Sequence, residues 1–206
     1  MMNGRVKKND ESCEVMPNYN RSERQKSKLT GLTRSNDLRL KLISMGDVEV
    51  GKSCLIKRYC EHKFFPKYLH TIGVDFGVKN TSIDGHVLKI NFWDLSGHEV
   101  FFEVRNEFYK DAQGAILVYD VNVKESFHNL DSWVAELKKY GGKASPYVVV
   151  CANKIDSGNR VVSEKDGRDW AARNDYSYFE TSAQTGEQVE QVFEQILKQI
   201  MNDHFR

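Results

Sequence analysis

Residues 46–53 read GDVEVGKS, which fits the pattern G-x-x-x-x-G-K-S, between the apolar run LRLKLISM and the helix-forming run GKSCLIKRYCEHKF. Gly46 and Gly51 let the backbone wrap around phosphate oxygens, and the helix that follows presents its positive end to them. Lys52 can reach the terminal phosphates and Ser53 can ligate Mg²⁺. The segment therefore predicts a nucleotide site. Its predicted contacts are Asp47, Val48, Glu49, Val50, Gly51, Lys52, Ser53 and Cys54.

A second motif, NKID at 153–156, follows the apolar run YVVVCA, which places it at the carboxyl edge of a sheet. The Asp156 carboxylate can accept hydrogen bonds from the N1–H and 2-amino groups of guanine, whereas adenine has no such pair of donors. Lys154 can lay its alkyl chain over the base, and Asn153 can tie this loop to the phosphate loop. The run ETSA at 180–183 accompanies NKID. Together they predict GTP or GDP and disfavour an ATP-dependent kinase.

Apolar runs that read as strands alternate with helical runs from Leu38 onward. VDFGVKNTSIDGHVLKINFWDL reads as two antiparallel strands joined at Asp84-Gly85, a dipeptide typical of tight hairpins. GAILVYDV and YVVVCANK are continuously apolar, like strands of a parallel sheet that is covered on both faces. Apolar residues three and four apart predict amphipathic helices over 127–137 and 189–200. This order predicts a three-layer α/β fold.

Composition divides the chain near residue 36. Residues 1–36 are polar and aperiodic, carry eight Lys or Arg against four Asp or Glu, and predict a disordered basic tail. Residues 37–206 are predicted to form one domain, and their 22 basic against 25 acidic residues disfavour nucleic-acid binding. The four cysteines lack CxxC spacing, and no apolar run is long enough to cross a membrane. We expect a protein of the reducing cytoplasm.

The phosphate loop, NKID and ETSA, in this order, resemble the Ras superfamily of small GTPases over residues 38–203. TIGVDFG at 71–77 and the WD that ends the third strand look like the Rab branch. The runs EVRNEFYKDAQGAILVYDV and VVVCANKID are similar to the Rab-like group related to DnaJ-bearing GTPases, the Rbj or RJL group. The resemblance implies a six-stranded, mostly parallel sheet with one antiparallel strand and five helices. It also implies a switch in intracellular trafficking that binds Mg²⁺ with GTP or GDP.

The resemblance also implies roles for single residues. Thr71 would close on Mg²⁺ and the γ-phosphate, Asp94 would hold the metal through a water, and Gly97 would sense the γ-phosphate through its N–H. Phe64 would stack near the base. Ser182 and Ala183 would approach the guanine O6. The other implied nucleotide contacts are Tyr68 and Gln184. The implied catalytic group is Thr71, Gly97 and His98.

His98 departs from the family pattern, because D-T-A-G-Q becomes DLSGH. Glutamine offers an acceptor and donors on one flexible arm, whereas neutral histidine has one donor and one acceptor on opposite sides of a rigid ring. The loss of one positioned partner of a transition state typically costs about 10²–10³-fold in rate. We therefore expect very slow intrinsic GTP hydrolysis. Two alternatives stay open: a partner that makes His98 productive, as in translational GTPases, and a loop histidine without a role.

Val48 and Glu49 stand where many hydrolytic relatives carry glycine or another small residue. A β-branched side chain beside the γ-phosphate would crowd both the attacking water and an arginine supplied by an activating protein. Val48 and His98 thus predict the same long-lived GTP state. The alternative is a non-hydrolysing scaffold that holds GTP as a structural cofactor.

The run KQIMNDHFR has no cysteine for a prenyl anchor, Asn3 follows Met1-Met2 where myristoylation needs glycine, and no DnaJ-type segment follows. We therefore expect no direct lipid anchor and no co-chaperone activity. We expect a monomer whose protein effectors bind the loops around Thr71 and His98. Association with basal bodies or cilia follows from the resemblance alone. The candidate aromatic residues of the effector surface, whose alternative is packing onto the sheet, are Phe101, Phe102, Phe108 and Tyr109.

Overall fold

The computed structural model describes residues 38–64, 66, 70–83, 85–143 and 145–204. The predicted tail over residues 1–36 and the predicted contact Tyr68 lie outside this part of the chain. Among the helices within these ranges, none has the length and apolar character needed to span a membrane.

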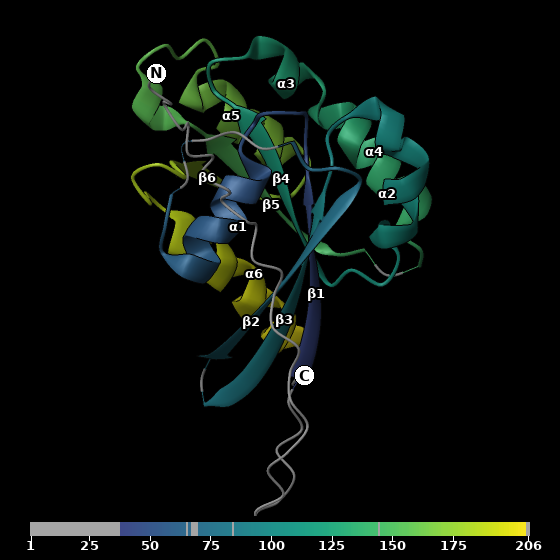
Figure 1. Ribbon diagram of the computed structural model, residues 1–206. Coiled ribbons are helices and arrows are strands. Elements are labelled where there is room, and N and C mark those ends of the chain that lie inside the picture. The colour runs from purple at the N-terminus through teal and green to yellow at the C-terminus, as the bar shows by residue number, and fades with distance from the viewer. Residues whose placement is uncertain (1–37, 65, 67–69, 84, 144, 205–206) are drawn as a thin grey trace, which may run out of the picture. The chain divides into compact units, whose positions relative to one another are not determined.

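Six strands form one sheet in the order β2–β3–β1–β4–β5–β6 (Figure 1). β2 and β3 are antiparallel and all other neighbours are parallel, as predicted. The hairpin register pairs Ile83 with His86, so its turn has two residues, and Gly85 adopts a φ of +82° that favours glycine. The strands are β1 (Leu38–Met45), β2 (Val74–Ile83), β3 (His86–Leu95), β4 (Gly114–Asp120), β5 (Tyr147–Asn153) and β6 (Ser177–Thr181).

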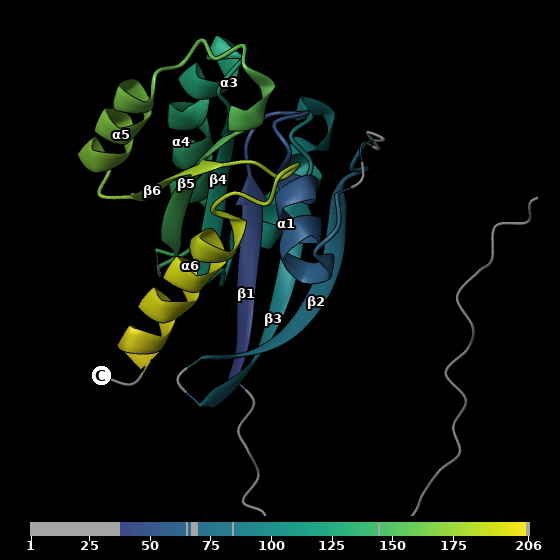
Figure 2. The same cartoon turned by 90° about the vertical axis from the view of Figure 1, so that its left-hand side faces the viewer.

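Helices cover both faces of the sheet, with α1 and α6 on one side and α2 and α4 on the other (Figures 1 and 2). Side chains of β1 alternate between the two cores: Leu42 packs with α1 and α6, and Ile43 packs with α2, α4 and α5. The α-helices are α1 (Lys52–Glu61), α2 (Phe102–Tyr109), α3 (Lys124–His128), α4 (Leu130–Tyr140), α5 (Glu164–Arg173) and α6 (Val189–His204). The 3₁₀ turns are η1 (Glu99–Phe101) and η2 (Ile155–Ser157).

The five helices that the resemblance implies are confirmed, with one of them divided into α3 and α4. α3 and α4 are separated only by Asn129, whose φ of −76° and ψ of −5° remain in the right-handed region. Its N–H donates to the Glu125 carbonyl, and its own carbonyl accepts from the Trp133 N–H. The two helices therefore follow the predicted 127–137 segment as one interrupted helix.

Of the two alternatives for the aromatic residues in and before α2, packing onto the sheet holds for Tyr109 and Phe108. Tyr109 is fully buried in the core between the sheet and helices α2, α4 and α5, and its hydroxyl donates to the Glu136 carboxylate. Phe108 is partly buried and its ring lies 4.9 Å from that of Trp93. These two side chains pack α2 onto the sheet, because aromatic rings at helical spacing fill the layer between a helix and its sheet. Phe101 and Phe102 are only partly exposed.

Candidate functional site

A cavity of about 1060 Å³ lies at the carboxyl edge of the central strands. Its walls come from the phosphate loop, the start of α1 and the loops that follow β3, β5 and β6. Its size suits a nucleotide, since ligand sites typically occupy roughly 300–1000 Å³. The predicted residues that line it are Val48, Glu49, Gly51, Lys52, Ser53, Cys54, Phe64, Thr71, Gly97, His98, Asn153, Lys154, Asp156, Ala183 and Gln184. Four other predicted residues do not line the cavity and lie behind its wall: Asp47, Val50, Asp94 and Ser182.

The phosphate loop has the backbone shape that its glycines allow. Gly46 has a φ of +133°, and a Cβ there would lie 2.1 Å from the Val118 carbonyl oxygen. The buried Lys52 amine folds back over the loop and donates to the carbonyls of Gly46 and Asp47 at 2.8 and 2.7 Å. Burial lowers the pKa of Lys52 to about 8, against the opposing effect of the nearby carboxylates. An anionic phosphate beside it would favour the charged amine.

Asp47 lines no part of the cavity, because its carboxylate faces the helix on the other side of the loop. The Trp133 indole N–H and the Asn129 amide donate to its two oxygens at 2.7 and 2.8 Å. Any ligand contact of Asp47 must therefore come from its backbone. The side chain instead fastens the phosphate loop to α4.

The three predicted metal-site residues meet in one cluster although they come from three segments. The Ser53 hydroxyl donates to Asp94 Oδ2, lies 3.1 Å from the Thr71 hydroxyl, and Thr71 Oγ1 donates to the same carboxylate oxygen at 3.3 Å. Ser44 donates to Asp94 Oδ1 at 2.5 Å and so fixes the carboxylate. An all-oxygen set suits Mg²⁺. Elsewhere in the described ranges, no group of three His, Cys, Asp or Glu side chains could hold a metal.

The Ser96–His98 loop lies directly on the phosphate loop. A Cβ on Gly97 would be 2.3 Å from the Asp47 carbonyl carbon and 2.5 Å from the Val48 nitrogen, so only glycine permits this approach. His98 Nδ1 accepts a hydrogen bond from the Val100 N–H at 3.2 Å and caps the 3₁₀ turn η1. The exposed imidazole is thus held by its own loop at the cavity wall.

A buried ion pair connects this loop to α4. Arg105 donates from Nε and Nη2 to both oxygens of Glu136 at 2.6 and 2.9 Å, and from Nη1 to the His98 carbonyl at 3.0 Å. The two side chains are only 6% and 11% exposed. The guanidinium also lies 4.6 Å from the centre of the Trp133 ring. One face of α4 therefore holds the phosphate loop directly and the loop that carries His98 through Arg105 of α2.

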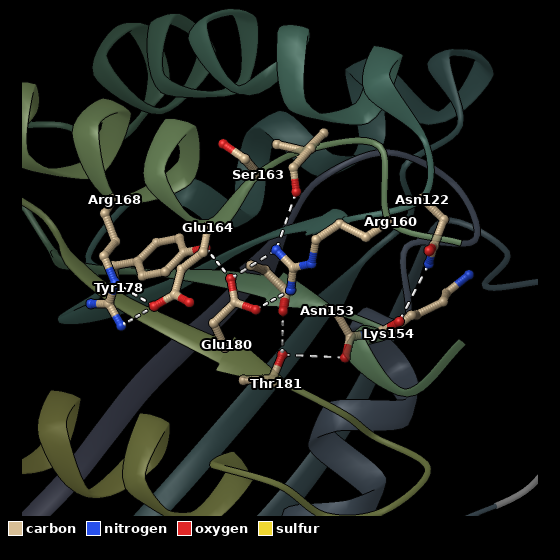
Figure 3. A network of polar contacts seen from close by, with 12 residues as sticks. Asn122, Asn153, Lys154, Arg160, Ser163, Glu164, Arg168, Tyr178, Glu180 and Thr181 are labelled. Carbon is tan, nitrogen blue, oxygen red and sulfur yellow. Dashed lines mark hydrogen bonds and ion pairs between the residues drawn. The ribbon is translucent and has the colours of Figure 1, made fainter. Parts of the chain in front are cut away.

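Asn153, the last residue of β5, contacts the phosphate loop, the end of β6 (Figure 3) and the loop that follows β6. Its amide donates to the Val50 carbonyl at 2.7 Å, which is the predicted tie to the phosphate loop. Its side-chain oxygen accepts from the Thr181 hydroxyl and the Ala183 N–H at 3.2 and 3.3 Å. Asn153 is fully buried, so these bonds are shielded from water.

Lys154 and Asp156 are each held by a neighbour. Lys154 has a left-handed backbone, and its amine pairs with Asp120 at 2.8 Å. Asp156 Oδ1 accepts from the Ser182 hydroxyl at 2.6 Å, so Ser182 supports the carboxylate from behind the wall. The Asp156 side chain stays at the cavity, where it can accept donors from a ligand.

Glu180, the first residue of the ETSA run, has a structural role. Its carboxylate pairs with Arg160 and accepts from the Tyr178 hydroxyl (Figure 3). Arg160 also donates to the Val162 carbonyl at 3.1 Å. The pair fixes the segment after NKID against β6 and lines no part of the cavity.

Sequence reasoning missed the residues that support the site from outside. Arg58, Arg105 and Trp133 belong to none of the nucleotide-binding motifs. The one signal that could have revealed the α4 face is its spacing, because Asn129, Trp133 and Glu136 recur at i, i+4 and i+7 with polar groups on an otherwise apolar side.

Comparison with known proteins agrees with this geometry. The sequence profile of the Ras family matches residues 41–202. DnaJ homolog subfamily C member 27 from Gallus gallus is 54% identical over 170 residues, which cover 80% of this chain and 62% of that protein. The Homo sapiens protein of the same name is 54% identical over 162 residues, which cover 76% and 59%. The chain thus spans about three fifths of the length of these relatives.

The profile match covers more than half of the chain and coincides with the described fold. The chain therefore belongs to the Ras family and is a Rab-like small GTP-binding protein.

Proposed function

We propose that the chain is a GTP/GDP regulatory switch whose intrinsic hydrolysis is very slow. The observation that carries this proposal is the hydrogen bond from the Val100 N–H to His98 Nδ1 at 3.2 Å. An acceptor Nδ1 carries no proton, so the neutral ring has its proton on Nε2. His98 then offers only a donor beyond its own loop and cannot orient an attacking water by accepting its proton.

In this proposal the phosphates bind the backbone of the phosphate loop and Lys52, with Ser53 and Thr71 on Mg²⁺ and Asp94 behind a metal-bound water. Mg²⁺ would neutralise charge on the phosphate oxygens. Asn153, Lys154 and Asp156 would bind guanine, together with the Ser182–Gln184 loop. The support for these roles is the convergence of all these segments on one cavity wall or directly behind it.

Val48 supports the same conclusion from the phosphate loop. Its side chain is 43% exposed and lines the cavity together with Gly97 and His98. A β-branched side chain there narrows the space for a water or for an arginine from a partner. Val48 and His98 both hinder the attack of water on the γ-phosphate. We therefore expect GTP to persist until a partner changes the conformation of the His98 loop.

An effector surface is part of the proposal. Ile72 beside Thr71, and Val100 and Val104 beside His98, are 80%, 73% and 48% exposed. A Cβ at Gly73 would lie 3.7 Å from the Val104 side chain, so the loop around Thr71 adjoins the start of α2, which follows the His98 loop. Apolar groups on adjoining loops suit a protein partner that senses both loops at once. The cytoplasmic and ciliary locations stay predictions.

Single-turnover GTP hydrolysis by the wild type and His98→Gln, measured from about pH 5.5 to 8.5, tests the slow switch. We expect the wild type to retain GTP and the glutamine variant to be at least about tenfold faster, because glutamine restores an acceptor and a donor on one arm. His128→Gln, an exposed histidine on α3, is the matched control and should change nothing.

Fast hydrolysis by the wild type that the His98→Gln change slows would contradict the slow switch, because His98 would then position the water. Bound GTP that neither hydrolyses nor exchanges when EDTA removes Mg²⁺ would instead indicate a scaffold with a structural nucleotide.

A further inference from the structure

Arg58, in the last turn of α1, reaches across to the loop that follows β6. Its Nε donates to the Ala183 carbonyl at 2.8 Å, and its Nη2 donates to the Gln184 carbonyl. Nη1 donates to the His62 carbonyl at 3.2 Å, at the end of the same helix. One planar guanidinium therefore joins the end of α1 to two consecutive peptide groups of the loop.

The loop over residues 182–186 forms a hydrogen-bonded turn that contacts Arg58. The Gly186 N–H donates to the Ser182 carbonyl at 2.8 Å, and the Thr185 N–H donates to the Ser182 hydroxyl at 3.0 Å. Gly186 has a φ of +89°, and a Cβ there would lie 3.8 Å from Cδ of Arg58. Asn153 Oδ1 accepts from the Ala183 N–H at 3.3 Å, so Asn153 and Arg58 hold the N–H and the carbonyl of Ala183 respectively.

The orientation of the carbonyls determines where the N–H groups point. In a trans peptide the C=O and the following N–H are antiparallel, so an Ala183 carbonyl held by Arg58 directs the Gln184 N–H the opposite way. Within the described part of the chain, no group accepts a hydrogen bond from this N–H. Gln184 lines the cavity with Asp156, which makes its N–H an available donor near the base site.

We propose that Arg58 is a positioning residue for guanine recognition. It sets the Ala183–Gln184 peptide so that a backbone N–H meets the O6 acceptor of guanine, while Asp156 accepts from N1–H and the 2-amino group. The inference rests on the proposed nucleotide site and adds a residue that touches no ligand. Asn153 holds the Ala183 N–H, whereas Arg58 holds the Ala183 carbonyl that sets the direction of the next N–H.

Competitive displacement of a fluorescent GDP from the full chain separates this role from a merely structural one. The competitors are GDP, 6-thio-GDP, which replaces O6 by a weak sulfur acceptor, and inosine diphosphate, which lacks only the 2-amino group. In Arg58→Ala we expect GDP affinity to fall about 3- to 10-fold, the worth of one neutral hydrogen bond. The preference for GDP over 6-thio-GDP should narrow by a similar factor, and the preference over inosine diphosphate should not change.

Lys198→Ala, which removes an exposed cation from α6, is the matched control and should bind all three nucleotides like the wild type. Arg58→Lys keeps the charge but has no fork for two carbonyls, so it should narrow the same preference if the alanine variant does not fold. Equal loss of affinity for all three nucleotides, or no change, would overturn the inference. Failure of the wild type to bind GDP would overturn the proposed function itself.

Discussion

Gly97 shows how one missing side chain can bring two loops into contact. The loop after β3 approaches the phosphate loop at Asp47 and Val48, and it does so only where no Cβ intervenes. His98 follows at once and uses its imidazole to cap the next turn. The position of the histidine at the cavity therefore follows from the glycine before it.

Gly97→Ala should lower the affinity for a non-hydrolysable GTP analogue at least about tenfold more than the affinity for GDP. The new methyl group would meet the Asp47 and Val48 backbone at 2.3 to 2.6 Å and push the loop away from the γ-phosphate. Gly77→Ala on β2 is the control, since a Cβ there meets nothing within 4 Å. Equal losses for both nucleotides would show that the loop does not sense the γ-phosphate.

At the scale of elements, α4 supports the site without lining the cavity. Asn129 and Trp133 hold Asp47 of the phosphate loop, and Glu136 holds Arg105 and, through it, the His98 carbonyl. Because the helix is rigid, its two contacts keep a fixed separation between the phosphate loop and the His98 loop. A shift of α4 would move both.

Glu136→Gln should lower the free energy of unfolding by about 3–5 kcal/mol, because it leaves the Arg105 charge buried without its partner. Urea denaturation measures this change. Glu194→Gln, in an exposed pair with Lys198, should cost about 0.5 kcal/mol or less. In the double variant Arg105→Met/Glu136→Met the loss should be smaller than in Glu136→Gln. A glutamine variant as stable as the wild type would show that the pair does not hold the loop.

At the scale of the whole molecule, the two cores enclose thiols and phenols that carry no charge at neutral pH. Burial raises the pKa of Cys60 to about 11 and of Tyr59 to about 12, and it also raises the pKa values of Cys151 and Tyr109. Burial lowers the pKa values of Lys41 and Lys52.

The free energy of unfolding should therefore fall as the pH rises from about 9 to about 11, the usual and the folded pKa of Cys60. A group with a raised folded pKa keeps a proton that the unfolded chain releases, so its stabilising contribution is complete below the unfolded pKa and is lost above it. Lys41 and Lys52, whose pKa values are lowered, make the free energy of unfolding rise with pH, but they are fewer than the thiols and phenols. Urea denaturation at about pH 8, 9, 10 and 11 measures the fall, which Cys60→Ala should reduce. Constant stability over this range would contradict the prediction.

The sequence by itself determined the order of elements and the parts of the site that lie on contiguous motifs. Alternation of apolar runs and helical spacing predicted the sheet and its layers, because these periods depend on local backbone geometry. GDVEVGKS and NKID predicted the two nucleotide-binding loops, because close approach to a phosphate or a base restricts the residue types at each position. The Mg²⁺ role of Ser53 came from the phosphate-loop motif and those of Thr71 and Asp94 from family resemblance, and the fold then brought their oxygen atoms together.

Only the tertiary structure decided which side chains support those loops from behind. Arg58, Arg105 and Trp133 lie between 31 and 126 residues from the groups they hold across elements, apart from the contact of Arg105 with His98. Such contacts depend on how the helices pack on the sheet, and the local hydrophobic periodicity of the sequence does not specify that packing. The same reason applies to Tyr109, for which the sequence left a surface role and packing onto the sheet open, and which is a buried hydrogen-bond donor to Glu136. Local spacing specifies an element and its faces, whereas the partner of each face is set by the packing of the whole chain.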